Sequence, residues 1–502
     1  MLSEHFDIVI VGAGLSGIGA AHHLQRRCSR RTYAILEGRG AIGGTWDLFR
    51  YPGIRSDSDM YTMGYSFRPW TNPKAIADGP SILGYIRDTA KEAGIDRHIR
   101  FNHWVTRASW SSEDAIWTVE AVRMPAQDGA PNEPVRITCN FLFMCSGYYR
   151  YSAGYLPEFA GTDRFKGQIV HPQKWPGGLD YVNKRVVVIG SGATAVTLVP
   201  ELAKTAAHVT MLQRSPTYIV SRPEQDAVAN WLRRHLPAKA AYAITRWRLV
   251  LLGMWFYRLC KRQPERIKEL IMKGVRAELG PDYDVATHFS PRYNPWDQRL
   301  CLVPDADLFR AMKSGRASIV TDRIETFTEK GLKLASGTEL EADVIVTATG
   351  LVMELLGGME VSVDGQQIDF SKTLNYRGAM YSGVPNLASA FGYTNASWTL
   401  KCDLTCEYVC RLLNRMDRQG FRQCTPRNRD PSMPTEPWLD FSSGYVQRAM
   451  ARFPKQGARP PWKLYQNYAL DIVSLRYGKM EDGVLEFSNP QKPVSSQEKQ
   501  VA

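Results

Sequence analysis

Two glycine-rich turns, each set between an apolar strand and a helix-compatible run, constrain this chain more than any other feature. The first lies in "FDIVIVGAGLSGIGAAHHL", where Gly12, Gly14 and Gly17 form the turn, and Glu37 ends the next strand, "TYAILE". Such glycines let backbone N–H groups at a helix start approach a pyrophosphate, and a carboxylate after the second strand accepts hydrogen bonds from a ribose. Because strand, turn, helix and acidic residue occur in this order, we predict a dinucleotide-binding unit at the amino end.

The second turn lies in "KRVVVIGSGATAVTLVPELA", which contains Gly190, Gly192 and the small residue Ala195 that lets helix and sheet pack closely. Its next strand, "HVTMLQRSPTY", ends in Arg214 and Ser215 rather than in an acid. A guanidinium and a hydroxyl suit a 2′-phosphate, which a carboxylate would repel. We therefore predict that the second unit binds NADPH in preference to NADH; the alternative is that Arg214 is a surface residue that merely follows a strand.

Two such units in one chain are typical of a flavin site followed by a nicotinamide site, so we predict FAD in the first and NADPH in the second. The segments "FLFMCSGYY" and "ADVIVTATG" bracket the second unit and mark where the chain leaves the flavin domain and returns. The predicted fold class is α/β, with two Rossmann-like dinucleotide-binding domains and a helical insertion in the NADPH domain. The predicted boundaries are 1–150 and 350–502 for the FAD-binding domain with its disordered C-terminal tail, and 151–349 for the NADPH-binding domain with an insertion at about 222–295.

The composition indicates how many domains the chain can form and in which compartment it resides. With 502 residues, of which 44% are apolar, the chain is long enough for two or three packed domains. The start "MLSEHFDIVIVGAG" lacks the basic region of a signal peptide, and nine cysteines without CxxC spacing favour reduced thiols, so we expect a cytoplasmic protein. Cys402, Cys406 and Cys410 share one helical face, for which a packing role is favoured over a metal or cluster site, and no metal is predicted.

The net charge of +13 is compatible with nucleic acid, an acidic membrane surface or an anionic cofactor as a partner. Basic residues gather between Arg246 and Arg276, around the apolar run "LVLLGMWFY", which is far shorter than the ~20 residues needed to span a bilayer. Two interpretations stay open for this helix: packing in its domain with a solvated basic face, which is favoured, and weak peripheral contact with a membrane. We expect small-molecule partners and no nucleic acid.

The segment between the two units carries a further signal. A chain that passes electrons to a disulfide needs a redox cysteine pair near the first motif, and none is present. The segment "FKGQIVHPQKWP" instead contains Phe165, Gly167, His171 and Trp175 in the spacing FxGxxxHxxxW(P/D). With "GGTW", "YPGIRSDSD" and "YNPWDQRLCLVP", the chain resembles type I Baeyer–Villiger flavin monooxygenases, and among them the branch of ethionamide-activating monooxygenases.

This resemblance implies an NADPH-dependent flavoprotein monooxygenase that inserts one atom of O2 beside a ketone carbonyl to give an ester or lactone. It implies a C4a-peroxyflavin stabilised by Arg299 and NADP+, with Asp57 as the carboxylate that positions this arginine; the alternative for Asp57 is a turn carboxylate in a loop rich in Ser and Asp. Sulfoxidation, including that of thioamide prodrugs, is implied as a side activity. The chain departs from the wider family in having Gln298 in place of a basic residue, and Arg292 is the fallback for the active-site arginine.

The motifs and the resemblance together predict which residues contact the cofactors. They are Gly12, Gly14, Ser16, Gly17, Glu37, Thr45, Trp46, Asp47, Leu48, Asp57, Val105, Gly190, Gly192, Ala193, Thr194, Ala195, Arg214 and Ser215.

The segment 165–176 lies on the predicted linker between the domains. Because the nicotinamide must first approach the flavin and then shift, this joint needs discrete arrangements, and we interpret the segment as a coupling element. For His171, a structural role and a titrating role are equally supported. Two alternatives for the whole protein stay open: a flavin-containing N- or S-oxygenating monooxygenase, and a catalytically silent nucleotide-binding or membrane-associated protein, which has no need of Asp57 or Arg299.

Overall fold

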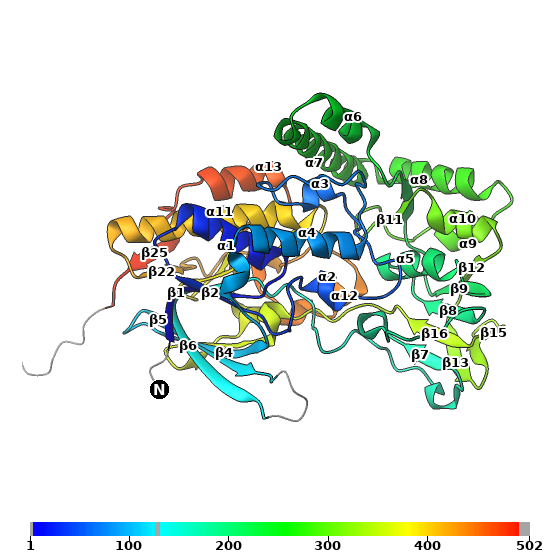
Figure 1. Cartoon of the computed structure of the whole chain (residues 1–502), viewed down its shortest axis with the longest axis horizontal. Coiled ribbons are helices and arrows are strands. Elements are labelled where there is room, and N and C mark those ends of the chain that lie inside the picture. Colours follow the sequence, from blue (N-terminus) through cyan, green and yellow to red (C-terminus); the bar gives the residue numbers. More distant parts are fainter. Residues whose placement is uncertain (1–3, 126–130, 491–502) are drawn as a thin grey trace, which may run out of the picture.

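A nine-stranded sheet built around the first glycine motif forms the left half of the molecule in Figure 1. The computed structural model describes residues 4–125 and 131–490. The strand order is β18-β17-β4-β5-β6-β1-β2-β3, and β21 pairs with β6 as well. The strands are β1 (Glu4–Val11), β2 (Tyr33–Leu36), β3 (Ile99–Arg100), β4 (His103–Ser111), β5 (Ile116–Arg123), β6 (Glu133–Met144), β17 (Glu360–Val363), β18 (Gln366–Gln367) and β21 (Leu387–Ser389).

The first strand explains why this sheet forms. The β-branched residues Ile8, Val9 and Ile10 of β1 are fully buried, and β1 runs parallel to both β2 and β6. The helices of this half are α1 (Leu15–Arg27), α2 (Thr45–Leu48), α3 (Met60–Met63), α4 (Gly79–Glu92), α11 (Trp398–Gln419), α12 (Gly444–Gln447) and α13 (Tyr468–Asp471). Cys402, Cys406 and Cys410 are among the buried residues of α11, as a packing face requires.

A second sheet, entirely parallel, forms around the other glycine motif on the right of Figure 1. Its order is β12-β9-β8-β16-β7. The elements are β7 (Gln168–Val170), β8 (Arg185–Ile189), α5 (Ala193–Leu202), β9 (His208–Gln213), α10 (Asp307–Lys313), β12 (Ala317–Thr321) and β16 (Val344–Thr347), with a small antiparallel sheet of β13 (Ile324–Thr328), β14 (Gly331–Leu334) and β15 (Glu339–Glu341) beside them. Two dinucleotide-binding sheets in one α/β chain confirm the predicted fold class.

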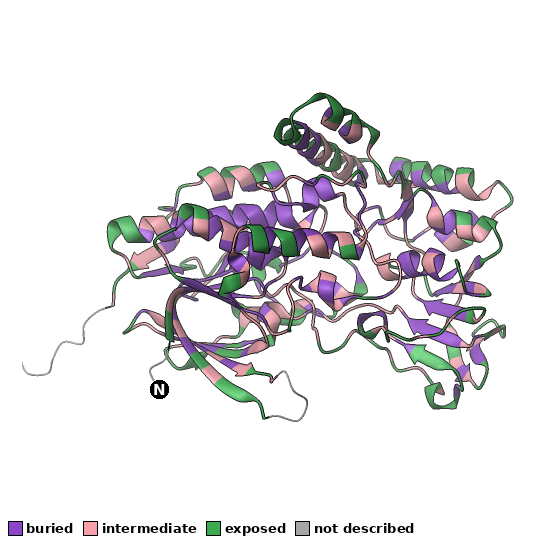
Figure 2. Ribbon diagram, in the orientation of Figure 1, coloured by how far each residue is buried: buried purple, intermediate pink, exposed green. Residues whose placement is uncertain are grey.

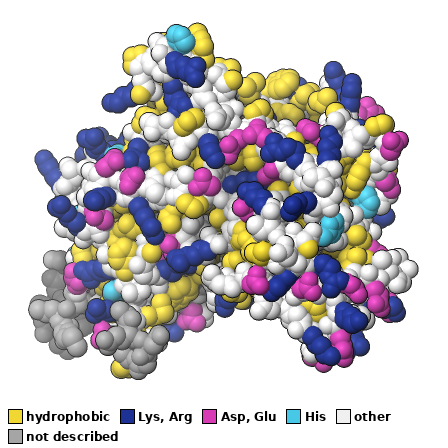
Figure 3. All heavy atoms as spheres, turned by 45° about the vertical axis from the view of Figure 1, so that its right-hand side comes forward, with side chains coloured by type: hydrophobic (Ala, Val, Ile, Leu, Met, Phe, Trp, Pro, Cys, Tyr) yellow, Lys and Arg dark blue, Asp and Glu magenta, His cyan; other side chains and the backbone are white. Residues whose placement is uncertain are grey.

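Four helices fall within the range predicted for the insertion: α6 (Ala227–His235), α7 (Ala238–Arg262), α8 (Pro264–Leu279) and α9 (Val285–Phe289). They follow β10 (Ile219–Arg222) and precede β11 (Cys301–Pro304), two parallel strands that pair with each other. The long helix α7 packs into both halves, because Tyr242 and Val250 belong to the core of the first half and Cys260 to that of the second. Figure 2 shows its outward side as exposed, and Figure 3 shows hydrophobic side chains at the surface in this upper region.

Two linkers carry the chain between the halves and run side by side. The amide of Tyr155 donates to the carbonyl of Gly350 at 3.0 Å, and the amide of Arg150 donates to that of Val352 at 2.9 Å.

The remaining strands form three two-stranded pairs: β19 (Asn375–Tyr376) with β20 (Met380–Tyr381), β22 (Gln423–Pro426) with β25 (Leu485–Ser488), and β23 (Thr435–Pro437) with β24 (Lys455–Gly457). The predicted disordered tail lies outside the described residues. Among the described residues, no helix combines the length and apolar character needed to cross a bilayer.

Candidate active site

A cavity of about 650 Å³ lies between the two sheets, where the carboxyl ends of β1 and β8 meet. Ligands of parallel α/β sheets bind at this edge, because the loops and helix N-termini converge there. Both glycine motifs open into the same cavity. The predicted site residues that line it are Gly12, Gly14, Ser16, Glu37, Thr45, Trp46, Asp57, Val105, Gly190, Gly192, Ala193, Thr194, Arg214 and Arg299.

The glycines fit the approach of two dinucleotides. Gly12 has φ +105° and Gly190 has φ +135°, and a Cβ atom would lie 2.6 Å from the carbonyl oxygen of Cys145 at the first and 2.3 Å from that of Ala348 at the second. Each turn thus brings its backbone against the neighbouring strand end, which only glycine allows. At Gly192 a Cβ atom would meet nothing within 4 Å, so the missing side chain leaves open space at the start of α5 for a pyrophosphate.

Glu37 lies directly after β2 and is almost fully buried at the edge of the cavity. Its Oε2 accepts the amide of Ala13 at 2.7 Å, and its Oε1 accepts the amide of Arg39 at 2.9 Å. Burial raises the pKa of Glu37 above its ordinary value, against the opposing effect of these two bonds. The carboxylate therefore orders the first glycine turn and stands where a ribose would lie.

Arg299 and Asp57 form a bidentate ion pair inside the cavity. The guanidinium Nε donates to one carboxylate oxygen and Nη2 to the other, both at 2.8 Å, while Nη1 donates to the carbonyl of Thr394 at 3.0 Å. Burial is the largest single influence and opposes the charge on Arg299, but the charge and hydrogen bond of Asp57, together with Tyr148 and Tyr445, raise the pKa of Arg299 above its ordinary value. Asp57 comes from the loop after α2 and Arg299 from the residues just before β11, so the pair joins the two halves of the molecule.

The loop that carries Arg299 is itself fixed on both sides. Asp297, two residues earlier, forms an ion pair of 2.7 Å with Lys261 in the last turn of α7. Its backbone carbonyl accepts the hydroxyl of Ser442 at 3.0 Å, just before α12. The alternative arginine, Arg292, is exposed and does not line the cavity.

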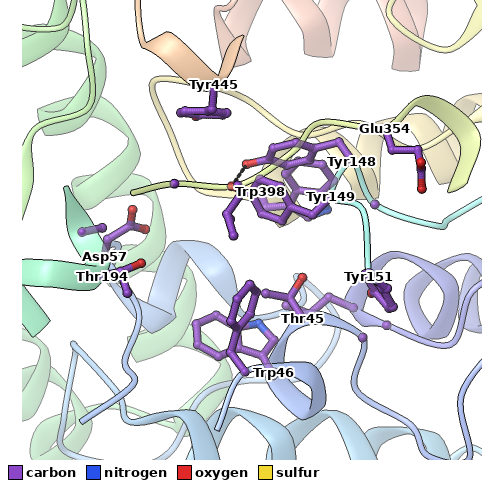
Figure 4. Close-up of a pocket in the computed structure, with 18 of the residues that line it drawn as sticks. Thr45, Trp46, Asp57, Tyr148, Tyr149, Tyr151, Thr194, Glu354, Trp398 and Tyr445 are labelled. Atoms are coloured by element: carbon purple, nitrogen blue, oxygen red, sulfur yellow. Dashed lines mark hydrogen bonds between the residues drawn. The ribbon is translucent and has the colours of Figure 1, made fainter. Parts of the chain in front are cut away.

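Aromatic residues that the sequence did not single out form another wall of the cavity. Tyr148 stacks on Trp398 with ring centroids 5.0 Å apart, and its hydroxyl lies 2.7 Å from that of Tyr149. The Trp398 indole donates to the hydroxyl of Ser16 at 2.8 Å. Figure 4 shows this group across the cavity from Asp57, with Tyr445 above it.

A signal for three of these residues exists in the sequence. Tyr148 and Tyr149 follow a glycine at the carboxyl end of β6, the sheet edge at which ligands bind. Trp398 begins α11 and Tyr445 belongs to the short helix α12, far along the chain. Tyr445 is marked by no local pattern, because only the tertiary fold brings its segment to the cavity. Trp398 ends the segment "GYTNASW", which the sequence predicts to take part in the flavin site.

Five residues predicted to contact cofactors do not line the cavity: Gly17, Asp47, Leu48, Ala195 and Ser215. Gly17 and Ala195 are buried where each helix meets its sheet, and Leu48 packs against the core of the second half. Asp47 is buried among Arg39, Arg50 and Arg87 and forms ion pairs with all three. Ser215 accepts the Ser191 hydroxyl through its backbone carbonyl at 3.1 Å, whereas the neighbouring Arg214 does line the cavity.

The four residues of the linker fingerprint also lie away from the cavity wall. Phe165 is buried against Phe327, and a Cβ atom on Gly167 would lie 2.4 Å from the carbonyl oxygen of Asp343. Trp175 packs edge-on against Tyr181, with ring centroids 6.3 Å apart.

The histidine of this segment lies against the linker that leaves the first half. A Cβ atom on Gly154 would come within 2.0 Å of the His171 ring, and burial lowers the pKa of His171. Gln173 donates to the carbonyls of Arg150 at 2.7 Å and Tyr151 at 3.1 Å. The segment thus ties the edge strand β7 to the joint between the halves.

Comparison with known proteins places this site in a family. The family model described as flavin-binding monooxygenase-like matches residues 60–232, and that of the NAD(P)-binding Rossmann-like domain matches residues 10–72. The FAD-containing monooxygenase EthA of Mycobacterium tuberculosis is 54% identical over 494 residues, which cover 98% of this chain and 100% of EthA. This chain belongs to the family of FAD-containing monooxygenases.

Solved structures agree with this assignment at the level of the fold. A cyclohexanone monooxygenase with ε-caprolactone bound superimposes with a TM-score of 0.74 at 22% identity, covering 97% of this chain and 100% of that one. OTEMO in complex with FAD and NADP superimposes with a TM-score of 0.67 at 22% identity, covering 85% of this chain and 87% of that one. This chain is therefore an FAD-containing monooxygenase with an NAD(P)-binding Rossmann-like domain around its first glycine motif.

Proposed function

We propose that this monooxygenase is of the Baeyer–Villiger type and inserts one oxygen atom of O2 beside a ketone carbonyl, giving an ester or lactone. The observation that carries the proposal is the Arg299–Asp57 pair in a cavity shared by both dinucleotide motifs. We further propose that residues 1–150 and 350–502 hold FAD and residues 151–349 hold NADPH. When bound, NADPH would supply the reducing electrons and the reduced flavin would activate O2.

The guanidinium of Arg299 is suited to stabilise negative charge on a reacting oxygen. It has five N–H donors, of which three are used by Asp57 and Thr394, so two remain for a ligand among the described contacts. Asp57 fixes the plane of the Arg299 guanidinium, so the remaining donors are oriented before a substrate arrives. The charge of the guanidinium is permanent. This cation would bind the oxyanion that develops when a ketone carbonyl is attacked.

The aromatic wall supports a ketone with an apolar body. Tyr148, Tyr149, Trp398 and Tyr445 would cover such a body and exclude water from the reacting atoms. For the structural neighbour cyclohexanone monooxygenase the bound ligand is a lactone, the product class proposed here. We propose sulfur oxidation, including that of thioamides, as a side activity of the same cavity.

The second half would position the nicotinamide and release it from the flavin. Arg214 lines the cavity at the end of β9, and its guanidinium would pair with a 2′-phosphate. The linker segment 165–176 would couple the two positions, since it joins β7 to the crossing chain through Gln173. His171, with its lowered pKa, would serve there as a neutral hydrogen-bonding group.

The test compares the Arg299→Ala and Arg292→Ala variants of the FAD-loaded enzyme. NADPH, isotopically labelled O2, a panel of linear and aromatic ketones and a methyl sulfide are supplied, and products are identified by mass spectrometry. Flavin reduction by NADPH is followed by its absorbance. Arg299→Ala should lower labelled ester formation about 100-fold or more while flavin reduction continues, and Arg292→Ala should leave both unchanged.

Two outcomes contradict the proposal. Full ester formation by Arg299→Ala would remove the arginine from the reaction. Labelled sulfoxide without any ester from the wild-type enzyme would instead assign the protein to the N- or S-oxygenating flavin monooxygenases.

A further inference from the structure

The outward face of α7 carries a row of large apolar side chains. Ile244, Trp247, Leu251 and Trp255 are 48%, 46%, 58% and 62% exposed, and Leu252 beside them is 50% exposed. The spacing of three and four residues puts the row on one side of the helix. We call these five residues the α7 ridge. Single exposed apolar residues are ordinary on a protein surface, whereas a contiguous row that includes two tryptophans marks a contact surface.

The ridge continues onto the C-terminal part of the chain. The Trp247 ring lies 5.8 Å from that of Tyr468, at the start of α13. Leu470, Val473 and Tyr477, which follow along α13 and the next helical turn, are all exposed. The hydrophobic side chains at the top of Figure 3 lie over this region of α6 and α7. The ridge thus contacts the C-terminal segment at Tyr468, and that segment presents exposed apolar side chains of its own.

The charged side chains of the two helices α6 and α7 all have the same sign. Residues 227–262, which form α6 and α7, contain no Asp or Glu. Their cations are Arg233, Arg234, Lys239, Arg246, Arg248, Arg258, Lys261 and Arg262. Three of them pair with acids from elsewhere, namely Arg246 with Asp403, Arg248 with Asp226 and Lys261 with Asp297. In the described part of the chain, no ion pair involves the exposed cations Arg234, Lys239, Arg258 and Arg262.

The helix that presents the ridge is firmly seated. Arg246, on its inner side, donates to the carbonyls of Tyr61 at 2.9 Å and Gly64 at 2.7 Å. The Tyr242 hydroxyl donates to the carbonyl of Tyr65 at 2.9 Å. Since the inner face is held by the first half of the molecule, the apolar residues cannot turn inward, and the ridge is a permanent part of the surface.

We propose that the α7 ridge docks on the surface of an anionic lipid bilayer. Tryptophan rings and aliphatic side chains suit the boundary between headgroups and acyl chains, while the flanking arginines and lysine attract anionic headgroups. A second copy of this chain fits the surface less well, because two ridges facing each other would bring two sets of unpaired cations together. The docking needs no membrane-spanning segment and does not depend on the reaction catalysed.

The test is flotation of the full-length, FAD-loaded protein with lipid vesicles. One vesicle type is pure phosphatidylcholine, and the other is an equimolar mixture of phosphatidylcholine and phosphatidylglycerol. The wild-type protein should float with the mixed vesicles and lose this binding as salt rises. Leu251→Ser/Trp255→Ser and Arg258→Glu/Arg262→Glu should each lower the partition coefficient about tenfold or more.

A matched control removes an exposed apolar residue from another place. Val182 is 54% exposed and lies near the second sheet, so Val182→Ser should float like the wild-type protein. Flavin content and thermal unfolding of all variants show that each is folded. Wild-type protein that stays below both vesicle types, or ridge variants that float unchanged, would overturn the proposal. If vesicle binding is absent and the ridge variants convert a dimer to a monomer, the face is instead a self-association surface.

Discussion

Arg299 and Asp57 show how much of this site depends on residues that are distant in sequence. The two are 242 positions apart, yet they make two hydrogen bonds of equal length. Their pairing follows from the resemblance to a family, whereas no local pattern in either loop predicts it. By contrast, Gly12 and Gly190 could be assigned from local order alone, because strand, glycine turn and helix are each encoded by adjacent residues.

The sequence predicted that Arg214 and Ser215 both bind the 2′-phosphate of NADPH, and the two residues can be tested separately. Arg214→Ala should raise the KM for NADPH about 10- to 100-fold, since a charge-assisted bond to the 2′-phosphate is lost, and should leave the KM for NADH nearly unchanged. Ser215→Ala is the matched control and should change either value little, because Ser215 does not line the cavity. Steady-state kinetics with both coenzymes checks this, and equal losses for NADPH and NADH would remove the phosphate role.

Among the elements, α7 is the one whose place the sequence predicted least well. Its apolar run and basic residues were visible in the chain, but they predicted a helix of the second domain. The structure packs it into both halves, because Tyr242 and Arg246 reach the loop after α3. These hydrogen bonds are accepted by backbone carbonyls of another segment, and the sequence of α7 contains no signal for such acceptors.

The buried guanidinium of Arg246 should contribute strongly to the packing of α7 against the first half of the molecule. Arg246→Met removes the donor to three buried backbone carbonyls and one charged neighbour of Asp403, so we expect the free energy of unfolding to fall by about 3 kcal/mol or more. Urea unfolding of the FAD-loaded protein measures this change. Arg248→Met, two residues along the same helix, removes a more exposed ion pair and should cost about 1 kcal/mol or less. Equal losses in the two variants would show that burial of Arg246 contributes nothing beyond an ordinary pair.

At the scale of the whole molecule, the side of the cavity next to the first glycine motif is assembled from both ends of the chain. Ser16 of α1 and Trp398 of α11 are joined by a hydrogen bond of 2.8 Å, and both line the cavity. A ligand that contacts both segments binds only the folded protein, where the two ends of the chain lie together, and therefore stabilises the fold. The two-sheet plan could be predicted from the glycine motifs, and the segment that ends in Trp398 was expected at the cavity. The contribution of Tyr445 from α12 could not be predicted, because it depends on the path of the chain after the second crossing.

Removal of FAD should therefore destabilise the entire first half. At a free FAD concentration of roughly a hundred times its Kd, binding contributes about 3 kcal/mol to the free energy of unfolding. Thermal unfolding of the deflavinated protein, before and after reloading with FAD, should show a lower midpoint that recovers on reloading. An unchanged midpoint would mean that FAD does not bind between these elements.

The order of synthesis gives the interrupted first half a further consequence. Strands β1 to β6 leave the ribosome first, yet β6 pairs with β21 and α1 packs against α11, which are made only after the whole second sheet. Every strand of that second sheet falls between Gln168 and Thr347, so this part of the nascent chain can fold before the part that precedes it. The part of α1 that packs against α11 stays uncovered until residues 398–419 have been translated. The proposed flavin site is thus the last part of the molecule to be completed, although its glycine motif is the first to be synthesised.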